Sequence, residues 1–178
     1  MTNHSSKSLK KFIDFFHYRA INSLTANDFI IGGKNIICEI DESKFKKYED
    51  FWIVGGVERT EKKKCFFVLT DNREAMTLKR IIKQHVKERS IIHTDKWHGY
   101  SHLESLNMKH RRVNHSKNRI EKGTGVHTNN IEGLWNGVKL NIKSRNRNRN
   151  LIEKHLKEFI WRRKHRDNLF NVFINCLI

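Results

Sequence analysis

IICEIDES (residues 36–43) is an apolar, β-prone run that ends in acidic residues and carries Asp41. A second run, SIIHTDKWHGY at 90–100, reaches Asp95 where its apolar residues end. Glu132 lies near the start of a third segment, HTNNIEGLWNGVK, whose apolar residues recur at helical spacing. The sequence therefore predicts two strand-borne aspartates followed by a helix-borne glutamate.

Polar links and breaker residues divide the chain into β-prone runs and amphipathic helices. Three strand-like runs in succession favour an antiparallel meander, and helices alternate with strands after it. That succession is typical of α/β proteins with a ribonuclease H-like fold, so we expect a mixed five-stranded sheet flanked by helices, as in the retroviral integrase catalytic core. The expected strands span 36–41, 51–58, 65–70, 90–94 and 110–114, and the expected helices span 9–24, 75–87, 99–106, 129–143 and 151–165.

The three acidic residues predict a site for divalent metal ions. Two-metal phosphoryl chemistry needs clustered carboxylates, because ions about 3.5–4 Å apart require charge compensation. Mg²⁺ binds through a few carboxylates and keeps its remaining positions for water and phosphate oxygens. We therefore expect Asp41, Asp95 and Glu132 to hold two Mg²⁺ or Mn²⁺ ions, with a nucleic-acid phosphodiester as the substrate.

Each aspartate also has a structural interpretation. A lone aspartate at a strand end is often a turn former, and Glu39 and Glu42 compete with Asp41 as carboxylates. Strand alternation would put Glu39 on the face of Asp41 and Glu42 on the opposite face. Asp95 could instead cap the helix that follows it. The conjunction of three acids in this order is far more specific than any one of them.

The Glu132 helix leaves two alternatives open. With Asn129 as N-cap, Glu132 would occupy the third helical position and form a capping box instead of holding metal. Lys139 lies on the side of Glu132 two turns along, where it would either hold a phosphate or be solvated. The histidines at 93, 98, 110, 115 and 127 have no paired spacing that is typical of a zinc site.

The chain is strongly basic. It has 178 residues, with 36 lysines and arginines against 19 acids, and its formal net charge of +17 favours a polyanionic partner. The acid-free run KLNIKSRNRNR at 139–149 and a second basic segment at 109–122 are expected to contact the DNA backbone with little sequence reading. The side chains concerned are Lys139, Lys143, Arg145, Arg147, Arg149, Arg111, Arg112 and Lys117.

Composition also limits the class of protein. No apolar run approaches the ~20 residues needed to span a bilayer, and the N-terminus lacks a secretory signal. We expect an intracellular protein, in the nucleus of a eukaryote or in the cytoplasm and nucleoid of a bacterium. Cys38 and Cys65 lie in apolar runs and are expected to be buried free thiols.

Several segments together resemble one group of transposases. The segments are IGGKNIICEIDESKF, WIVGGVER, TDKWHGY, VNHS, GVHTNNIEGLWNGVK and EFIWRR, which fall within residues 31–163. They are similar to the Asp-Asp-Glu (DDE) transposases of the Merlin superfamily and their bacterial ISXO-type insertion-sequence relatives. The resemblance implies that Asp41, Asp95 and Glu132 are metal ligands, and that Lys139 is the lysine that follows the glutamate in this family. It also implies hydrolysis at transposon ends, followed by attack of the freed 3′-hydroxyl on target DNA.

The resemblance further implies an organisation and a set of partners. We expect 1–31 to be a helical remnant of a DNA-binding region in a shortened copy, 32–166 the catalytic domain, and 167–178 a C-terminal tail. The expected partners are transposon ends and target DNA, bound by a homo-oligomer, with no membrane and no small-molecule substrate.

Two other functions stay open. The chain could be a catalytically silent or host-adopted DNA-binding protein that keeps the basic surface alone. It could also be a cellular ribonuclease H-like nuclease that acts on RNA or hybrids, although HTNNIEGLWNGVK fits the motifs of those enzymes poorly.

Overall fold

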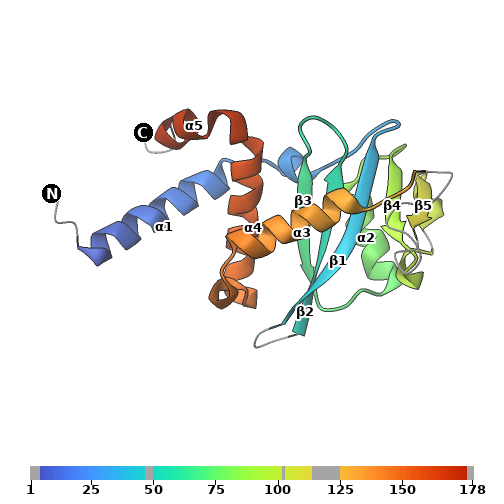
Figure 1. The fold of residues 1–178 in the computed structure, drawn as a ribbon, viewed down its shortest axis with the longest axis horizontal. Helices are drawn as coiled ribbons and strands as arrows, with labels where there is room; N and C mark the ends of the chain where they lie inside the picture. The colour runs from blue at the N-terminus through green and yellow to red at the C-terminus, as the bar shows by residue number, and fades with distance from the viewer. Residues whose placement is uncertain (1–4, 47–49, 102, 114–124, 176–178) are drawn as a thin grey trace.

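A computed structural model of the protein describes residues 5–46, 50–101, 103–113 and 125–175. They form one five-stranded sheet with helices on both faces and a group of helices to one side (Figure 1). The strands are β1 (Ile37–Lys46), β2 (Asp50–Glu58), β3 (Cys65–Thr70), β4 (Ile91–Asp95) and β5 (Lys109–Val113), and the α-helices are α1 (Ser6–Asn22), α2 (Ala75–His85), α3 (Asn129–Asn141), α4 (Arg149–Lys164) and α5 (Leu169–Asn175).

The strands lie in the order β3-β2-β1-β4-β5 across the sheet. The first three form the expected antiparallel meander, whereas β4 runs parallel to β1 and β5 runs parallel to β4. A parallel return needs a crossover, and α2 supplies it between β3 and β4. This mixed sheet, with α2 on one face and α3 and α4 on the other, confirms the predicted ribonuclease H-like fold (Figure 1).

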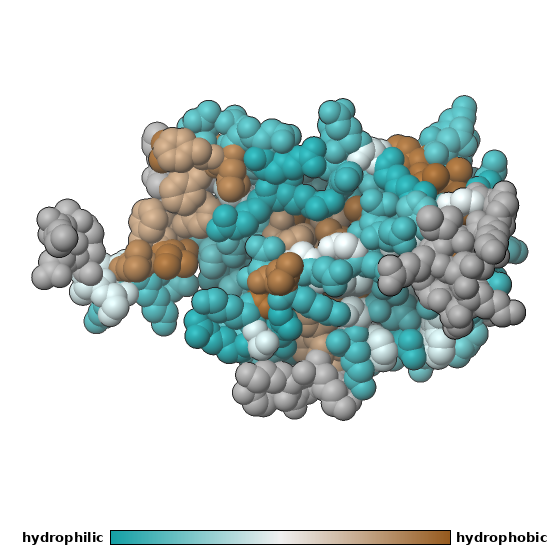
Figure 2. Space-filling model, viewed as in Figure 1, coloured by the Kyte–Doolittle hydropathy of each residue, from teal (hydrophilic) through white to brown (hydrophobic). Residues whose placement is uncertain are grey.

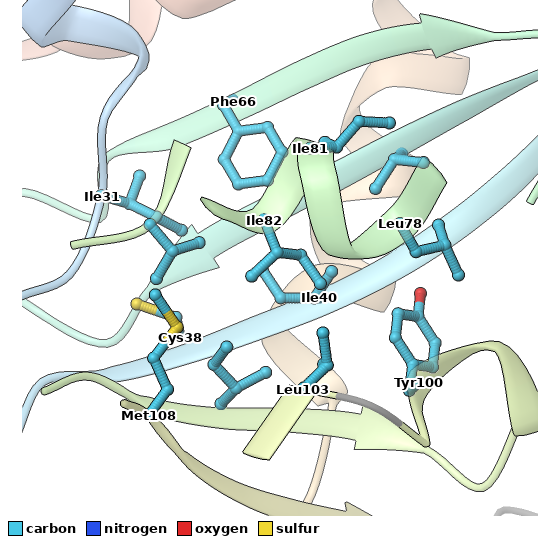
Figure 3. Packing of buried hydrophobic residues seen from close by; sticks show 13 residues of the cluster. Ile31, Cys38, Ile40, Phe66, Leu78, Ile81, Ile82, Tyr100, Leu103 and Met108 are labelled. Carbon is cyan, nitrogen blue, oxygen red and sulfur yellow. The ribbon is translucent and has the colours of Figure 1, made fainter. Parts of the chain in front are cut away.

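Side-chain alternation along the strands divides the core into two layers. The layer under α2 includes Cys38, Ile40, Val54, Phe66, Leu78, Ile81, Ile82, Ile92 and Tyr100 (Figure 3). The layer under α3 and α4 includes Phe45, Phe51, Ile53, Val57, Cys65, Ile131, Leu134, Trp135 and Val138. Because β1 is covered on both faces, each of its acidic side chains must find partners in the layer that it meets.

β1 is longer than the sequence analysis predicts. The expected strand ends at 41, but pairing with β2 continues from Asp41, opposite Gly55, to Lys46, opposite Asp50. The extension is stabilised by Phe45 and Phe51, whose buried rings stack with centroids 6.4 Å apart. Asp41 therefore lies in the middle of a strand, whereas Asp95 is the last residue of β4, as predicted.

The single helix predicted over 99–106 is wrong. Two short 3-10 helices, His98–Tyr100 and Leu103–Leu106, occupy this segment. Each turn buries one large side chain, Tyr100 in the first and Leu103 in the second. Two separate turns bring both side chains to the α2 layer.

Helices α1, α4 and α5 form a third cluster beside the sheet. Trp161 of α4 is fully buried, packs edge-on against Phe16 at 5.4 Å, and donates its Nε1–H to Ser23 Oγ at 3.0 Å. The sequence analysis predicted α1 and α4 but not the short α5, which adds Leu169 and Phe173 to this cluster. Apolar side chains stay exposed over α1 and α5, where brown residues gather in Figure 2.

Burial explains the state of the cysteines. Cys38 and Cys65 are buried free thiols, as predicted, and burial raises the pKa of each to about 12. Cys176 lies outside the described residues. Within the described ranges, no helix is long and apolar enough to cross a membrane.

Gly55 tests how closely α3 approaches the sheet. A Cβ at this position would lie 2.7 Å from Cζ2 of Trp135, so Gly55→Ala must displace the indole. We expect this variant to lose about 1–3 kcal/mol of unfolding free energy, measured by urea denaturation. Gly133→Ala is the control, since nothing lies within 4 Å of its added methyl group, and it should gain up to about 1 kcal/mol through helix propensity. Equal stability of the two variants would contradict this packing.

Candidate active site

The two aspartates lie level with each other on neighbouring parallel strands. The β1–β4 register pairs Glu39 with His93, and two further residues along each strand bring Asp41 beside Asp95. Their electrostatics agree with this proximity: burial, together with the charges of Glu42 and Asp95, raises the pKa of Asp41 to about 7. Asp95 Oδ1 accepts a hydrogen bond from the Trp97 N–H at 2.9 Å, which orients its carboxylate.

Glu42 lies on the opposite face of β1, as alternation predicts. Its carboxylate pairs with Arg73 Nη1 at 3.0 Å and accepts a hydrogen bond from the buried Tyr100 hydroxyl. The Arg73 guanidinium lies between two indole rings, 4.3 Å from that of Trp52 and 3.8 Å from that of Trp97. This stack links the residue after Asp41 to the turn that follows Asp95.

Glu39 shares the α3 face with Asp41 but is fully buried. Its Oε2 accepts the backbone N–H groups of Asn130 at 2.8 Å and Ile131 at 3.0 Å. Its Oε1 accepts Asn130 Nδ2 at 2.7 Å and Arg59 Nε at 2.5 Å. Glu39 therefore caps α3 from a neighbouring strand.

The alternative role of Glu132, in a capping box with Asn129 as N-cap, is not what the structure shows. Asn129 is the first residue of α3 and Thr128 is the N-cap, so Glu132 occupies the fourth helical position. The Thr128 Oγ1 to Glu132 Oε1 distance is 3.5 Å, and Thr128 makes no side-chain cap hydrogen bond. The two backbone N–H groups that such a box would satisfy have other acceptors: the Asn129 N–H donates to His127 Nδ1 and the Glu132 N–H donates to the Thr128 carbonyl. The two N–H groups between them, of Asn130 and Ile131, donate to Glu39.

Glu132 is exposed on α3, one turn before Trp135. Trp135 Nε1 donates to Asp41 Oδ2 at 3.1 Å and thereby attaches the Glu132 helix to Asp41. Of the three predicted ligands, the structure brings Asp41 and Asp95 together and places Glu132 on the adjacent helix. Among the described residues, no three His, Cys, Asp or Glu side chains are close enough to hold one metal ion together.

The pattern of charge compensation distinguishes the acids of β1. Glu39 pairs with Arg59 and Glu42 pairs with Arg73, whereas in the described part of the chain Asp41 forms no ion pair. Asp95 likewise has no ion pair with any residue in the described ranges, and two neighbouring carboxylates of this kind are a hard-oxygen donor set that fits a divalent cation. Asp41 and Asp95 are therefore the pair that a metal ion would stabilise most.

The histidines near the acids support the fold. Arg59 Nη2 lies 3.2 Å from His93 Nδ1 and 3.0 Å from His127 Nδ1, and it donates to the His127 carbonyl at 2.8 Å. Burial and the Arg59 charge lower the pKa of His93 to about 4, so its ring is neutral at pH 7. Burial likewise lowers the pKa of His110 to about 4, and His110 Nε2 lies 2.8 Å from Thr94 Oγ1.

The predicted DNA contacts fall into two groups. Some arginines are already used inside the protein: Arg147 Nε donates to the Ile142 carbonyl at 2.8 Å, and Arg149 pairs with Asp71 at 2.5 Å. Arg112 is partly buried on β5, and Lys117 lies outside the described residues. Besides Arg149, the exposed members are Lys139, Lys143, Arg145 and Arg111.

The sequence analysis assigned no role to several residues that build the site. Glu39 was named only as a competitor of Asp41. Strand alternation nevertheless predicted correctly that the two side chains share one face of β1. Arg59, Trp135 and Gly55 are joined to the acids by contacts far apart in sequence. The adjacent glycines of WIVGGVER are a local signal of close approach that could have pointed to Gly55, although they do not identify the Trp135 ring as its neighbour.

Comparisons with known proteins identify the family to which the chain belongs. The family described as ISXO2-like transposase domain matches residues 26–166. A protein of Haemophilus influenzae (strain ATCC 51907 / DSM 11121 / KW20 / Rd) named "Uncharacterized transposase-like protein" is 33% identical over 100 residues, which cover 56% of this chain and 80% of that protein. A chain of the simian T-cell lymphotropic virus intasome, solved in complex with PP2A regulatory subunit B56 gamma, aligns with a TM-score of 0.47 and 18% identity. That alignment covers 71% of this chain and 49% of the viral chain.

The raised pKa of Asp41 predicts a pH-dependent cost to stability. Between its ordinary value of 3.8 and about 7, the folded state binds more protons at this carboxyl than the unfolded state. Stability therefore falls as pH rises through this window, and the cost is complete above it. In metal-free buffer at pH 8, we expect the free energy of unfolding of Asp41→Asn to exceed that of the wild type by about 1–2 kcal/mol.

Urea denaturation at pH 8 and pH 4 checks this expectation. The advantage of Asp41→Asn should disappear at pH 4, and Mg²⁺ should reduce it at pH 8 by stabilising the wild type alone. A variant that is no more stable than the wild type at pH 8 would contradict the electrostatic description.

Proposed function

We propose, from the premise that this chain belongs to the ISXO2-like transposase domain family, that it catalyses DNA transposition as a DDE enzyme. In this proposal it hydrolyses phosphodiesters at transposon ends and joins the freed 3′-hydroxyl to target DNA. The observation that carries the proposal is the proximity of Asp41 to Asp95 on two neighbouring parallel strands, beside a helix that Trp135 attaches to Asp41.

The proposed metal ligands are Asp41, Asp95 and Glu132, with Mg²⁺ or Mn²⁺ as the ions. Two such ions, when bound, would supply Lewis-acid stabilisation of the attacking and leaving oxygens. The rigid strands hold Asp41 and Asp95, while α3 brings Glu132 from the adjacent layer. Trp135 and the Trp97 N–H each occupy one carboxylate oxygen and so orient the two aspartates.

The exposed cations are proposed to hold the DNA backbone. Lys139 lies on α3, the helix of Glu132, where it is suited to a phosphate near the acids. Lys143 and Arg145 follow α3 directly and are both exposed. Contacts of this kind bind phosphate without reading bases, and they weaken as salt rises.

Loss of one acid tests the proposed reaction. We expect wild-type protein with Mg²⁺ or Mn²⁺ to nick or join supercoiled plasmid DNA, and Asp95→Asn and Glu132→Gln to reduce this to background. Asp167→Asn is the matched control, because Asp167 is an 88% exposed carboxylate near the end of α4. Cleavage by Asp95→Asn at the wild-type rate would remove Asp95 from the mechanism. Tight DNA binding without turnover by the wild type would favour a silent or host-adopted binder.

Salt dependence tests the proposed DNA contacts. The double change Lys143→Ala with Arg145→Ala should reduce the slope of log binding constant against log salt concentration by about 1–2, measured by fluorescence anisotropy on duplex DNA. Arg147→Ala is the comparison, because this arginine bonds to the Ile142 carbonyl at the end of α3. We expect Arg147→Ala to lower the melting temperature of the protein and to leave the slope close to that of the wild type. An unchanged slope in the double variant would place the DNA elsewhere.

A further inference from the structure

The Glu39 carboxylate is occupied entirely by donors that hold α3 and its approach segment. Three of its four hydrogen bonds come from the first turn of α3, through the Asn130 and Ile131 N–H groups and the Asn130 side chain. The fourth comes from Arg59 Nε. With no exposed surface and a guanidinium 2.5 Å away, this carboxylate is unsuited to binding a metal cation.

Arg59 extends the same connection to the segment that precedes α3. It follows β2 directly, and its Nη2 group donates to the His127 carbonyl at 2.8 Å while approaching the His93 and His127 rings. One guanidinium therefore neutralises Glu39 and, through the His127 carbonyl, holds the backbone two residues before α3. A buried pair that lost either partner would leave an uncompensated charge, which is strongly unfavourable.

Hydrogen bonds join the side chains of β1 to α3 at two places, and Glu132 lies between them along the chain. Glu39 bonds to Asn130 and Ile131 on one side of it. Asp41 bonds to Trp135 on the other side, 3.1 Å from its indole nitrogen. Because Glu39 and Asp41 are two residues apart on one strand face, the two contacts set both the axial position and the tilt of the helix.

We propose that Glu39 is a positioning residue, which with Arg59 sets the distance between Glu132 and the aspartates of the sheet. The inference rests on the proposed function, since Glu132 is the third carboxylate of the proposed metal site. Glu39 acts through α3 and does not touch the reacting atoms. Glu39 would support a residue that binds the metal. Removing such a supporting residue typically weakens metal affinity by about 10–100-fold.

Hydrogen exchange of single amides in the whole ¹⁵N-labelled chain tests the anchor without any turnover. In the wild type, the Asn130 and Ile131 amides should be protected, although they belong to the first turn of a helix. In Glu39→Gln, these amides should exchange at least about tenfold faster than in the wild type, because the charged acceptor is lost.

Glu58→Gln is the matched control. Glu58 is also a buried glutamate that accepts a backbone N–H group, from Gly32 at 2.9 Å, and its other donor among the described residues is the Thr60 hydroxyl, so neither donor belongs to α3. It should leave the Asn130 and Ile131 amides at the exchange rates of the wild type, after correction for global stability. Equal acceleration in both variants, or none in Glu39→Gln, would overturn the proposal.

The metal requirement of cleavage gives the second readout. The Mn²⁺ concentration for half-maximal cleavage should rise by about 10–100-fold in Glu39→Gln and stay unchanged in Glu58→Gln. If the wild type does not cleave DNA at all, the proposed function fails, while the exchange result still decides whether Glu39 anchors α3. Normal metal dependence in Glu39→Gln, together with faster exchange, would restrict Glu39 to a structural role and overturn the positioning proposal.

A milder variant covers the case in which Glu39→Gln does not fold. Arg59→Lys keeps the positive charge beside Glu39 but loses the second nitrogen that reaches the His127 carbonyl. Relative to the wild type, it should accelerate exchange of the Asn130 and Ile131 amides and raise the Mn²⁺ concentration for half-maximal cleavage. Wild-type values for both would overturn the proposal.

Discussion

The pleat of β1 is the constraint on which the other arrangements depend. Because this strand is covered on both faces, each acid in CEIDE meets a defined layer of the core. Glu39 and Asp41 lie on the face covered by α3, and Glu42 lies on the face covered by α2. A shift of one residue would exchange these environments and bury uncompensated carboxylates. The hairpin with β2, extended by the Phe45–Phe51 stack, keeps that register.

Compensation of charge then separates structural acids from a candidate catalytic one. Arginines neutralise Glu39 and Glu42, and because both carboxylates are buried, loss of either arginine would be costly to the fold. Asp41 receives an indole N–H instead of a cation and lies beside Asp95, so its charged form is disfavoured. Stability is thus sacrificed at the position where a cation would restore it, which is common at functional sites.

The sequence predicted the mixed five-stranded sheet, its antiparallel meander and the elements that carry the three acids, because apolar periodicity and strand alternation are local signals. Prediction from local sequence failed where contacts between residues far apart in the chain determine the structure. The capping box at Asn129 was a sound local pattern, yet Glu39, more than ninety residues earlier, supplies the cap. Likewise, nothing near Arg59 indicates that it joins β2 to the segment before α3. The extension of β1 beyond Asp41 depended on pairing with β2, which polar residues in SKFK concealed.

The bond between Trp135 and Asp41 gives this centre an internal optical probe. The chain has four tryptophans, and this one has its ring nitrogen 3.1 Å from the carboxylate in question and its six-membered ring above the backbone of Gly55. Any change of charge at Asp41 alters the field across that indole, whereas Trp161 lies in the separate α1–α4–α5 cluster. Emission from this ring would therefore register events at the carboxylate directly, without a label and without a substrate.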